Sequence, residues 1–214
     1  DFYPAADGRW LHRELGYAHM QRQWEDEGRP PLIQLTPEID TAGRAALETL
    51  GLPPDAWFVT LHVRESAYFR EDTSWAHNRH RNSVVDTYLP AIKAIAERGG
   101  WVVRIGGADV TPLSDVEGVI DLATIRGHDP DLDTYCCAAG LFFLANESGP
   151  VFAATAFGVP LLGTNWFGYG VWPVSRNDLY IPKLLRNGDG RYLSMAEMVE
   201  PHFFGISAAE AYDS

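Results

Sequence analysis

The chain has 214 residues and a mass of 23.8 kDa, the size of one large domain or two small ones. Its hydrophobic fraction of 46% is ordinary for a globular protein with a sizeable core. The formal net charge is −12, from 17 basic and 29 acidic residues, so long-range attraction to nucleic acid or to an anionic membrane has the wrong sign. We therefore expect no nucleic-acid partner, and any bound anion must be held by a local cluster of donors.

A start without a signal-like sequence and two cysteines that do not suit a disulfide favour a cytoplasmic protein. The 2 lysines against 15 arginines favour a GC-rich bacterial source. No run approaches the roughly 18 apolar residues of a membrane helix, the best being residues 138–145. The adjacent Cys136 and Cys137 suit neither a disulfide nor a four-ligand zinc site and are predicted as small apolar residues of a helix. The chain begins without Met or a signal-like sequence, so we expect it to be part of a longer protein.

The first 38 residues are predicted as an N-terminal helical and linker segment (1–38), with a helix over 11–27 that docks by its aromatic residues. The remainder, 39–214, is predicted as one domain. Its first element is an amphipathic helix over 41–50, in which Ala and Leu recur at helical spacing. We expect Thr41 to cap this helix and the following Gly and Pro residues to end it.

From residue 57 onward, short apolar runs alternate with helical patterns. The predicted strands are 57–63, 101–105, 118–122, 141–145 and 159–163. The predicted helices are 87–98, 131–139, 151–157 and, after a stretch of weak pattern, 195–200. Near-continuously apolar strands that alternate with helices are typical of a parallel sheet covered on both faces. The predicted fold class is therefore α/β, doubly wound, with a mostly parallel, Rossmann-like sheet.

Ligands of such sheets bind in the crevice beyond the carboxyl ends of the strands. The residues directly after the predicted strands are polar, rich in glycine and include two arginines, which is typical of a nucleotide pocket. In chain order they are His62 to Glu65, Arg104 to Gly107, Asp121, Asn146 to Gly149, and Gly163 to Asn165.

The strongest local signal is His62-x-Arg64-Glu65 at the end of the first strand. Because side chains alternate along a strand, His62 and Arg64 point to the same face. There the planar fork of the arginine, with the imidazole as a second donor, suits a diphosphate. The alternative is structural, with Arg64 paired to Glu65 and His62 in the core.

A second signal is a concentration of basic side chains in the loop over residues 66–83. This loop is predicted to close over an anionic donor or to approach the acceptor, and the alternative is a solvated loop, because Glu71 and Asp72 dilute the bias. The basic side chains are Arg70, His77, Arg79, His80 and Arg81.

Two further patterns have both a functional and a structural interpretation. Ser148, before a predicted helix, suits an anion site built with helix N-terminal N–H groups, but Ser is also a preferred N-cap. The glycine two residues before Ser148 that a nucleophile elbow needs is missing, so a serine hydrolase is not expected. Asp131 and Asp133 offer the aspartate-x-aspartate of metal-dependent sugar transferases, although acidic residues entering a helix more often stabilise its positive end.

Residues 58–65 (FVTLHVRE) resemble the HVRE signature of a bacterial glycosyltransferase family related to GT-B fucosyltransferases, including O-fucosyltransferases and nodulation fucosyltransferases. The resemblance covers about residues 40–165, and its matches, taken together in chain order, are more specific than any one of them. The further matches are Arg81-Asn82 before 88–92, then 99–106, Pro112-Leu113 with 119–121, Ser148-Gly149, and 157–160.

The resemblance implies the nucleotide-sugar half of a GT-B enzyme, with Arg64 on the donor diphosphate, Ser148 near it, and neither a metal nor another cofactor. A GDP-sugar is the favoured donor, although Glu65 departs from the eukaryotic fucosyltransferases. An acceptor domain is expected to precede the chain or to be reduced. The donor-binding residues that it implies are Arg64, Asn82, Arg104, Gly106, Asp121, Ser148 and Gly149.

The resulting hypothesis is metal-independent transfer of a sugar to a glycan, a polysaccharide or another small acceptor. Arg64, with amides near Ser148, would stabilise the departing diphosphate, and Glu65 or His62 would take the proton of the acceptor hydroxyl. One alternative is a non-catalytic nucleotide-sugar-binding or protein-interaction module with a degenerate transferase fold. A third is a metal-dependent transferase that uses Asp131 and Asp133.

Overall fold

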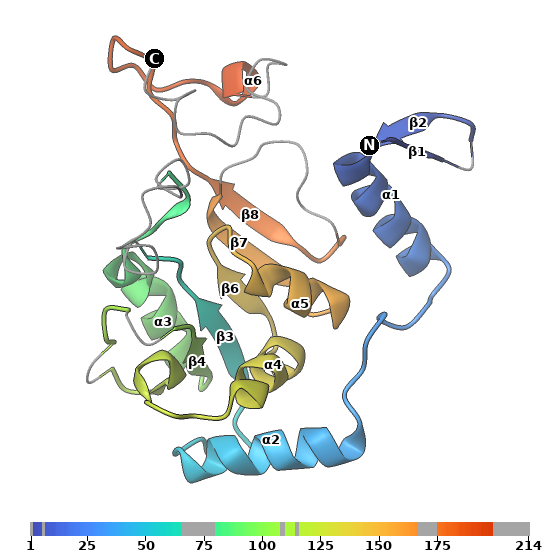
Figure 1. Cartoon of the computed structure of the whole chain (residues 1–214). Coiled ribbons are helices and arrows are strands. Elements are labelled where there is room, and N and C mark those ends of the chain that lie inside the picture. The colour runs from blue at the N-terminus through green and yellow to red at the C-terminus, as the bar shows by residue number, and fades with distance from the viewer. Residues whose placement is uncertain are drawn as a thin grey trace.

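Six parallel strands form the central sheet of the protein in a computed structural model, which describes residues 2–5, 7–65, 80–107, 110–113, 116–166 and 175–198 (Figure 1). Their order across the sheet is β5-β4-β3-β6-β7-β8. Counted along the chain from β3, this is third, second, first, fourth, fifth, sixth, so the winding reverses between β3 and β6. The predicted doubly wound, parallel α/β fold is confirmed. The strands are β3 Phe58–His62, β4 Trp101–Ile105, β5 Val119–Asp121, β6 Phe143–Ala145, β7 Leu161–Trp166 and β8 Leu179–Pro182.

Helices cover both faces of this sheet, and each face has its own hydrophobic cluster. One face packs against α4 (Pro130–Ala139) and α5 (Pro150–Ala156), and α2 (Pro37–Thr49) contacts α4. The other face packs against α3 (Leu89–Ala96). Successive strand residues join opposite clusters, as the two-residue period of a strand requires. The interiors of β3, β4 and β6 therefore give apolar side chains to both clusters, and the buried polar side chains among them are Thr60 and Arg104.

Several predicted helix boundaries are wrong for local reasons. Helix α2 begins at Pro37, and its N-cap is Thr36, whose hydroxyl accepts from the Ile39 N–H at 3.4 Å. The predicted cap, Thr41, lies inside the helix and donates to the Pro37 carbonyl. The predicted helix 87–98 is a 3-10 turn, Val85–Tyr88, followed by α3.

The two ends of the chain differ most from the prediction. The N-terminal helix is α1, Arg13–Asp26, and it follows a hairpin that was not predicted, β1 (Phe2–Pro4) with β2 (Trp10–His12). Strand β8 was also not predicted. The last predicted helix is α6, Met195–Met198, and residues 199–200 lie outside the described residues. The proposed division at residue 38 stays a prediction.

Two further findings concern the cysteines and the search for a membrane-spanning helix. Cys136 and Cys137 are buried in α4, as predicted, and burial raises the pKa of both thiols. Among the described residues, no helix has the length and apolarity needed to cross a bilayer.

Candidate functional site

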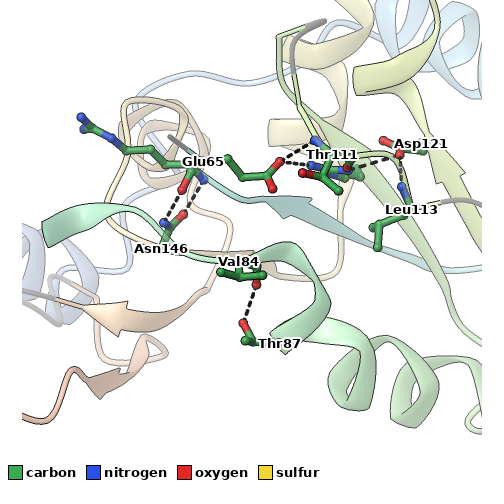
Figure 2. Close-up of polar contacts among 9 residues, drawn as sticks. Glu65, Val84, Thr87, Thr111, Leu113, Asp121 and Asn146 are labelled. Atoms are coloured by element: carbon green, nitrogen blue, oxygen red, sulfur yellow. Dashed lines mark hydrogen bonds and ion pairs between the residues drawn. The ribbon is translucent and has the colours of Figure 1, made fainter. Parts of the chain in front are cut away.

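The candidate site lies at the reversal point of the sheet, where the chain leaves β3 and β6. These neighbouring strands end level with each other, with His62 paired to Ala145. Just beyond, the fully buried Asn146 side chain accepts from the Arg64 backbone N–H at 2.7 Å and donates to the Arg64 carbonyl at 3.1 Å (Figure 2). It also donates to the Arg81 carbonyl at 2.9 Å. Asn146 thus joins three segments at one point.

Arg64 and Asn82, both predicted to bind the donor, lie together at this point. The Arg64 Nε–H donates to Asn82 Oδ1 at 3.1 Å. Arg81, from the predicted basic loop, lies beside Glu147, with 3.2 Å between its Nε and Glu147 Oε1. The remaining basic residues of that loop, Arg70, His77 and Arg79, lie outside the described residues, so the predicted closure over a donor stays a prediction.

His62 and Ser148 form a second contact at the reversal point of the sheet. Ser148 Oγ lies 2.9 Å from His62 Nδ1, and both belong to the α5 side of the sheet. The N-cap of α5 is Gly149 and no side chain caps it, so the alternative of Ser148 as the N-cap is wrong. Burial, together with the positive charges of Arg104 and Arg64, lowers the pKa of His62 to about 4. His62 is therefore a neutral imidazole at neutral pH.

This pKa gives His62 a measurable effect on stability. Between pH 6.5 and about pH 4 the unfolded chain binds a proton on His62 while the folded chain does not, so stability falls as the pH falls through this window. At pH 4.5 the loss attributable to His62 is about 2–3 kcal/mol. Urea unfolding at pH 7 and 4.5 gives the loss of stability of wild type and of His62→Asn. The two proteins share all other titrating groups, so the difference between their losses is the contribution of His62. If both proteins lose equal stability, the imidazole is solvated rather than buried.

Glu65, Arg104 and Asp121 form a buried ion-pair network on the α3 side of the sheet. Arg104 is fully buried, and its Nη2 donates to Glu65 Oε2 at 2.8 Å while its Nη1 lies 3.3 Å from Asp121 Oδ2. The same two carboxylate oxygens accept from the backbone N–H groups of Thr111 (3.0 Å) and Leu113 (2.9 Å), as Figure 2 shows. The network therefore fastens the segment after β4 to the ends of β3 and β5.

This network changes the interpretation of two predictions. The structural alternative paired Arg64 with Glu65. This pairing is wrong, because Glu65 pairs with Arg104. Arg104 and Asp121, implied by the resemblance as donor-binding residues, contact each other and the protein backbone. Their contact with a donor stays a prediction.

The two glycines of the predicted donor site have different surroundings. Gly106 has a φ of +151°, a conformation that favours glycine, and a Cβ at this position would stand 4.0 Å from His62 Cδ2. Gly106 thus lies beside the imidazole. Gly149 begins α5, and a Cβ there would have no other atom within 4 Å.

The acidic residues of the alternative metal site are engaged with the start of α4. Asp129 caps that helix by accepting from the Asp131 N–H at 3.0 Å, and Asp133 Oδ1 lies 3.0 Å from His128 Nε2. Within the described parts of the chain, no three His, Cys, Asp or Glu side chains are grouped as metal ligands. A metal-independent reaction stays a prediction.

Two residues that the sequence did not single out as donor-site residues support the candidate site. Asn146 is in the predicted turn, but nothing local shows that its amide holds Arg64, which is 82 residues away. Lys183 follows the unpredicted β8, and its Nζ donates to the carbonyls of His80 and Asn82.

Comparison with known proteins gives a fold but no family. No protein-family model matches the chain, and no curated protein matches it. It is similar in structure to a glycosyl transferase of family 9 from Veillonella parvula, with a TM-score of 0.51 and 11% identity over 71% of this chain and 42% of that one. ADP-heptose lps heptosyltransferase II of E. coli gives a TM-score of 0.49 and 17% identity over 79% of this chain and 49% of that one.

The chain therefore spans less than half the length of these solved proteins. Its Rossmann-like sheet resembles the fold of one part of the family 9 glycosyl transferase. The relation to fucosyltransferases on residues 58–65 stays a prediction.

Proposed function

We propose that the chain is the donor-binding part of a glycosyltransferase that uses a nucleoside diphosphate-sugar without a metal ion. The observation that carries the proposal is the position of Arg64, which Asn82 and Asn146 hold at the reversal point of a doubly wound sheet. Doubly wound sheets bind nucleotides at this point. An arginine offers a diphosphate two parallel hydrogen bonds and a charge that is present at every physiological pH.

In this proposal Arg64 neutralises the charge that develops on the departing diphosphate as the glycosidic bond breaks. Of the two predicted proton acceptors, the geometry favours His62. Glu65 Oε2 already accepts from Arg104 and from the Thr111 N–H, whereas His62 is a neutral imidazole whose pKa of about 4 makes it a weak base before a donor binds. A diphosphate bound nearby would raise the pKa of His62 toward the range that suits a general base.

The acceptor is proposed to be a glycan, a polysaccharide or another small molecule, bound with the help of a further domain. The match to only 42% of the family 9 protein supports this division. GDP is the first nucleotide to test, following the sequence resemblance.

The experiment is calorimetric titration of the folded chain with GDP, ADP, UDP, CDP and dTDP, first with a chelator and then with Mg²⁺. We expect one diphosphate to bind without metal, and its monophosphate to bind about tenfold more weakly because contacts to the second phosphate are lost. Binding that requires Mg²⁺ supports the metal-dependent alternative, and a folded chain that binds no diphosphate contradicts the proposal. Transfer from the matching nucleotide-sugar then separates a transferase from a non-catalytic module.

A further inference from the structure

Lys183 reaches from the edge of the sheet to the backbone of residues 80–82. It directly follows β8, and two strands, β6 and β7, lie between β8 and β3. Its Nζ donates to the His80 carbonyl and, at 2.8 Å, to the Asn82 carbonyl. Burial lowers the pKa of Lys183, while the nearby charge of Glu147 opposes this shift.

Each of the four residues 80–83 has one backbone group that is bonded to a distant part of the chain. The carbonyls of His80 and Asn82 accept from Lys183, and the Arg81 carbonyl between them accepts from Asn146. The Ser83 N–H donates to the Arg64 carbonyl at 2.9 Å. Such a backbone has one orientation, so the Asn82 side chain that it carries also has a defined direction.

Asn82 transmits this constraint to Arg64. Its backbone carbonyl accepts from Lys183 and its side-chain Oδ1 accepts from the Arg64 Nε–H. The contacts therefore run in an unbroken line from Lys183 through Asn82 to the guanidinium at the reversal point of the sheet. An arginine that is already oriented loses less conformational entropy on binding an anion than a mobile one.

We infer that Lys183 is a positioning residue for the diphosphate site, which holds Asn82 and through it orients Arg64. This inference rests on the proposed function. Lys183 differs from a direct phosphate ligand because two of its three N–H groups are used on backbone carbonyls. Charge-assisted bonds of this kind are among the stronger ones in proteins.

The test is a double-mutant cycle with inorganic pyrophosphate as the probe, measured by calorimetry without Mg²⁺. We expect Lys183→Met to weaken pyrophosphate binding about tenfold, and Lys183→Arg, which keeps charged donors, to recover most of the loss. The matched control is Lys93→Met, which removes the only other lysine of the chain, on the exposed side of α3, and is expected to change binding less than about twofold.

The cycle separates positioning from direct contact. In an Arg64→Lys background, which lacks the Nε–H that meets Asn82, we expect Lys183→Met to have less than about a twofold effect. An equal loss in both backgrounds would show that Lys183 contacts the phosphate itself and would overturn the inference.

Two further outcomes keep the inference separate from protein stability and from the proposed function. Asn82→Ala leaves the backbone carbonyl that Lys183 holds and removes the carboxamide with the Oδ1 that meets Arg64, so we expect the same tenfold loss. If Asn82→Ala binds pyrophosphate as well as wild type, Asn82 does not orient Arg64 and the inference fails. This result does not depend on whether Lys183→Met folds. If wild type binds and only Arg64 variants lose affinity, the inference alone fails, whereas a wild type that binds no diphosphate overturns both.

Discussion

Arg104→Met is expected to lower the free energy of unfolding by about 3–5 kcal/mol, or to prevent folding. The fully buried guanidinium stands between two carboxylates, Glu65 and Asp121, so its removal leaves both acids in the interior without a counter-charge. Its Nη1 also donates to the Thr111 carbonyl at 2.6 Å, and that bond is lost as well. Urea unfolding at pH 7 measures the effect.

A triple variant is the control for this prediction. Arg104→Met combined with Glu65→Gln and Asp121→Asn removes all three charges, and we expect it to recover more than half of the lost stability. A single Arg104→Met variant within about 1 kcal/mol of wild type would mean that water, rather than the guanidinium, compensates the two acids.

The sheet was largely predictable because its strands are buried on both faces. Strand β4 matches its predicted range, and β3 and β6 each lie within a longer predicted run. Strand β8 lacks that signal because it is an edge strand, in which Leu179 and Ile181 are 68% and 61% exposed. A short edge strand that alternates between exposed and half-buried residues does not give a continuous apolar run.

The candidate site was predictable only in part, because its pairings depend on strand register. The sequence places His62, Arg64 and Arg104 at the carboxyl ends of their strands. The pairing of Arg104 with Asp121 requires β4 and β5 to align at those residues, and no local pattern specifies that alignment.

Contacts between residues far apart in the chain are even harder to predict from the sequence. Lys183 meets Asn82 across 101 residues, and Asn146 meets Arg64 across 82. Each is a single polar residue in an irregular segment, where the type of residue does not indicate which backbone group it will contact.

Arg64→Ala is expected to weaken binding of the cognate nucleoside diphosphate at least about a hundredfold, since a bidentate, charge-assisted contact is lost. The free energy of unfolding should change by less than about 1 kcal/mol, because the partners of Arg64 that fasten the backbone, Asn146 and the Ser83 N–H, contact its main-chain atoms. Calorimetry and urea unfolding on the same preparations measure the two quantities.

The matched control for Arg64→Ala is Arg98→Ala, which removes an equal charge from an exposed position just after α3. In a chain of net charge −12, the loss of an arginine away from the site slightly raises the long-range repulsion of an anion, and Arg98→Ala measures that contribution alone. We expect it to change affinity less than about twofold. Equal losses in the two variants would mean that the anion responds to the total charge and not to a site. A large loss confined to Arg64→Ala would instead support phosphate recognition at the reversal point of the sheet.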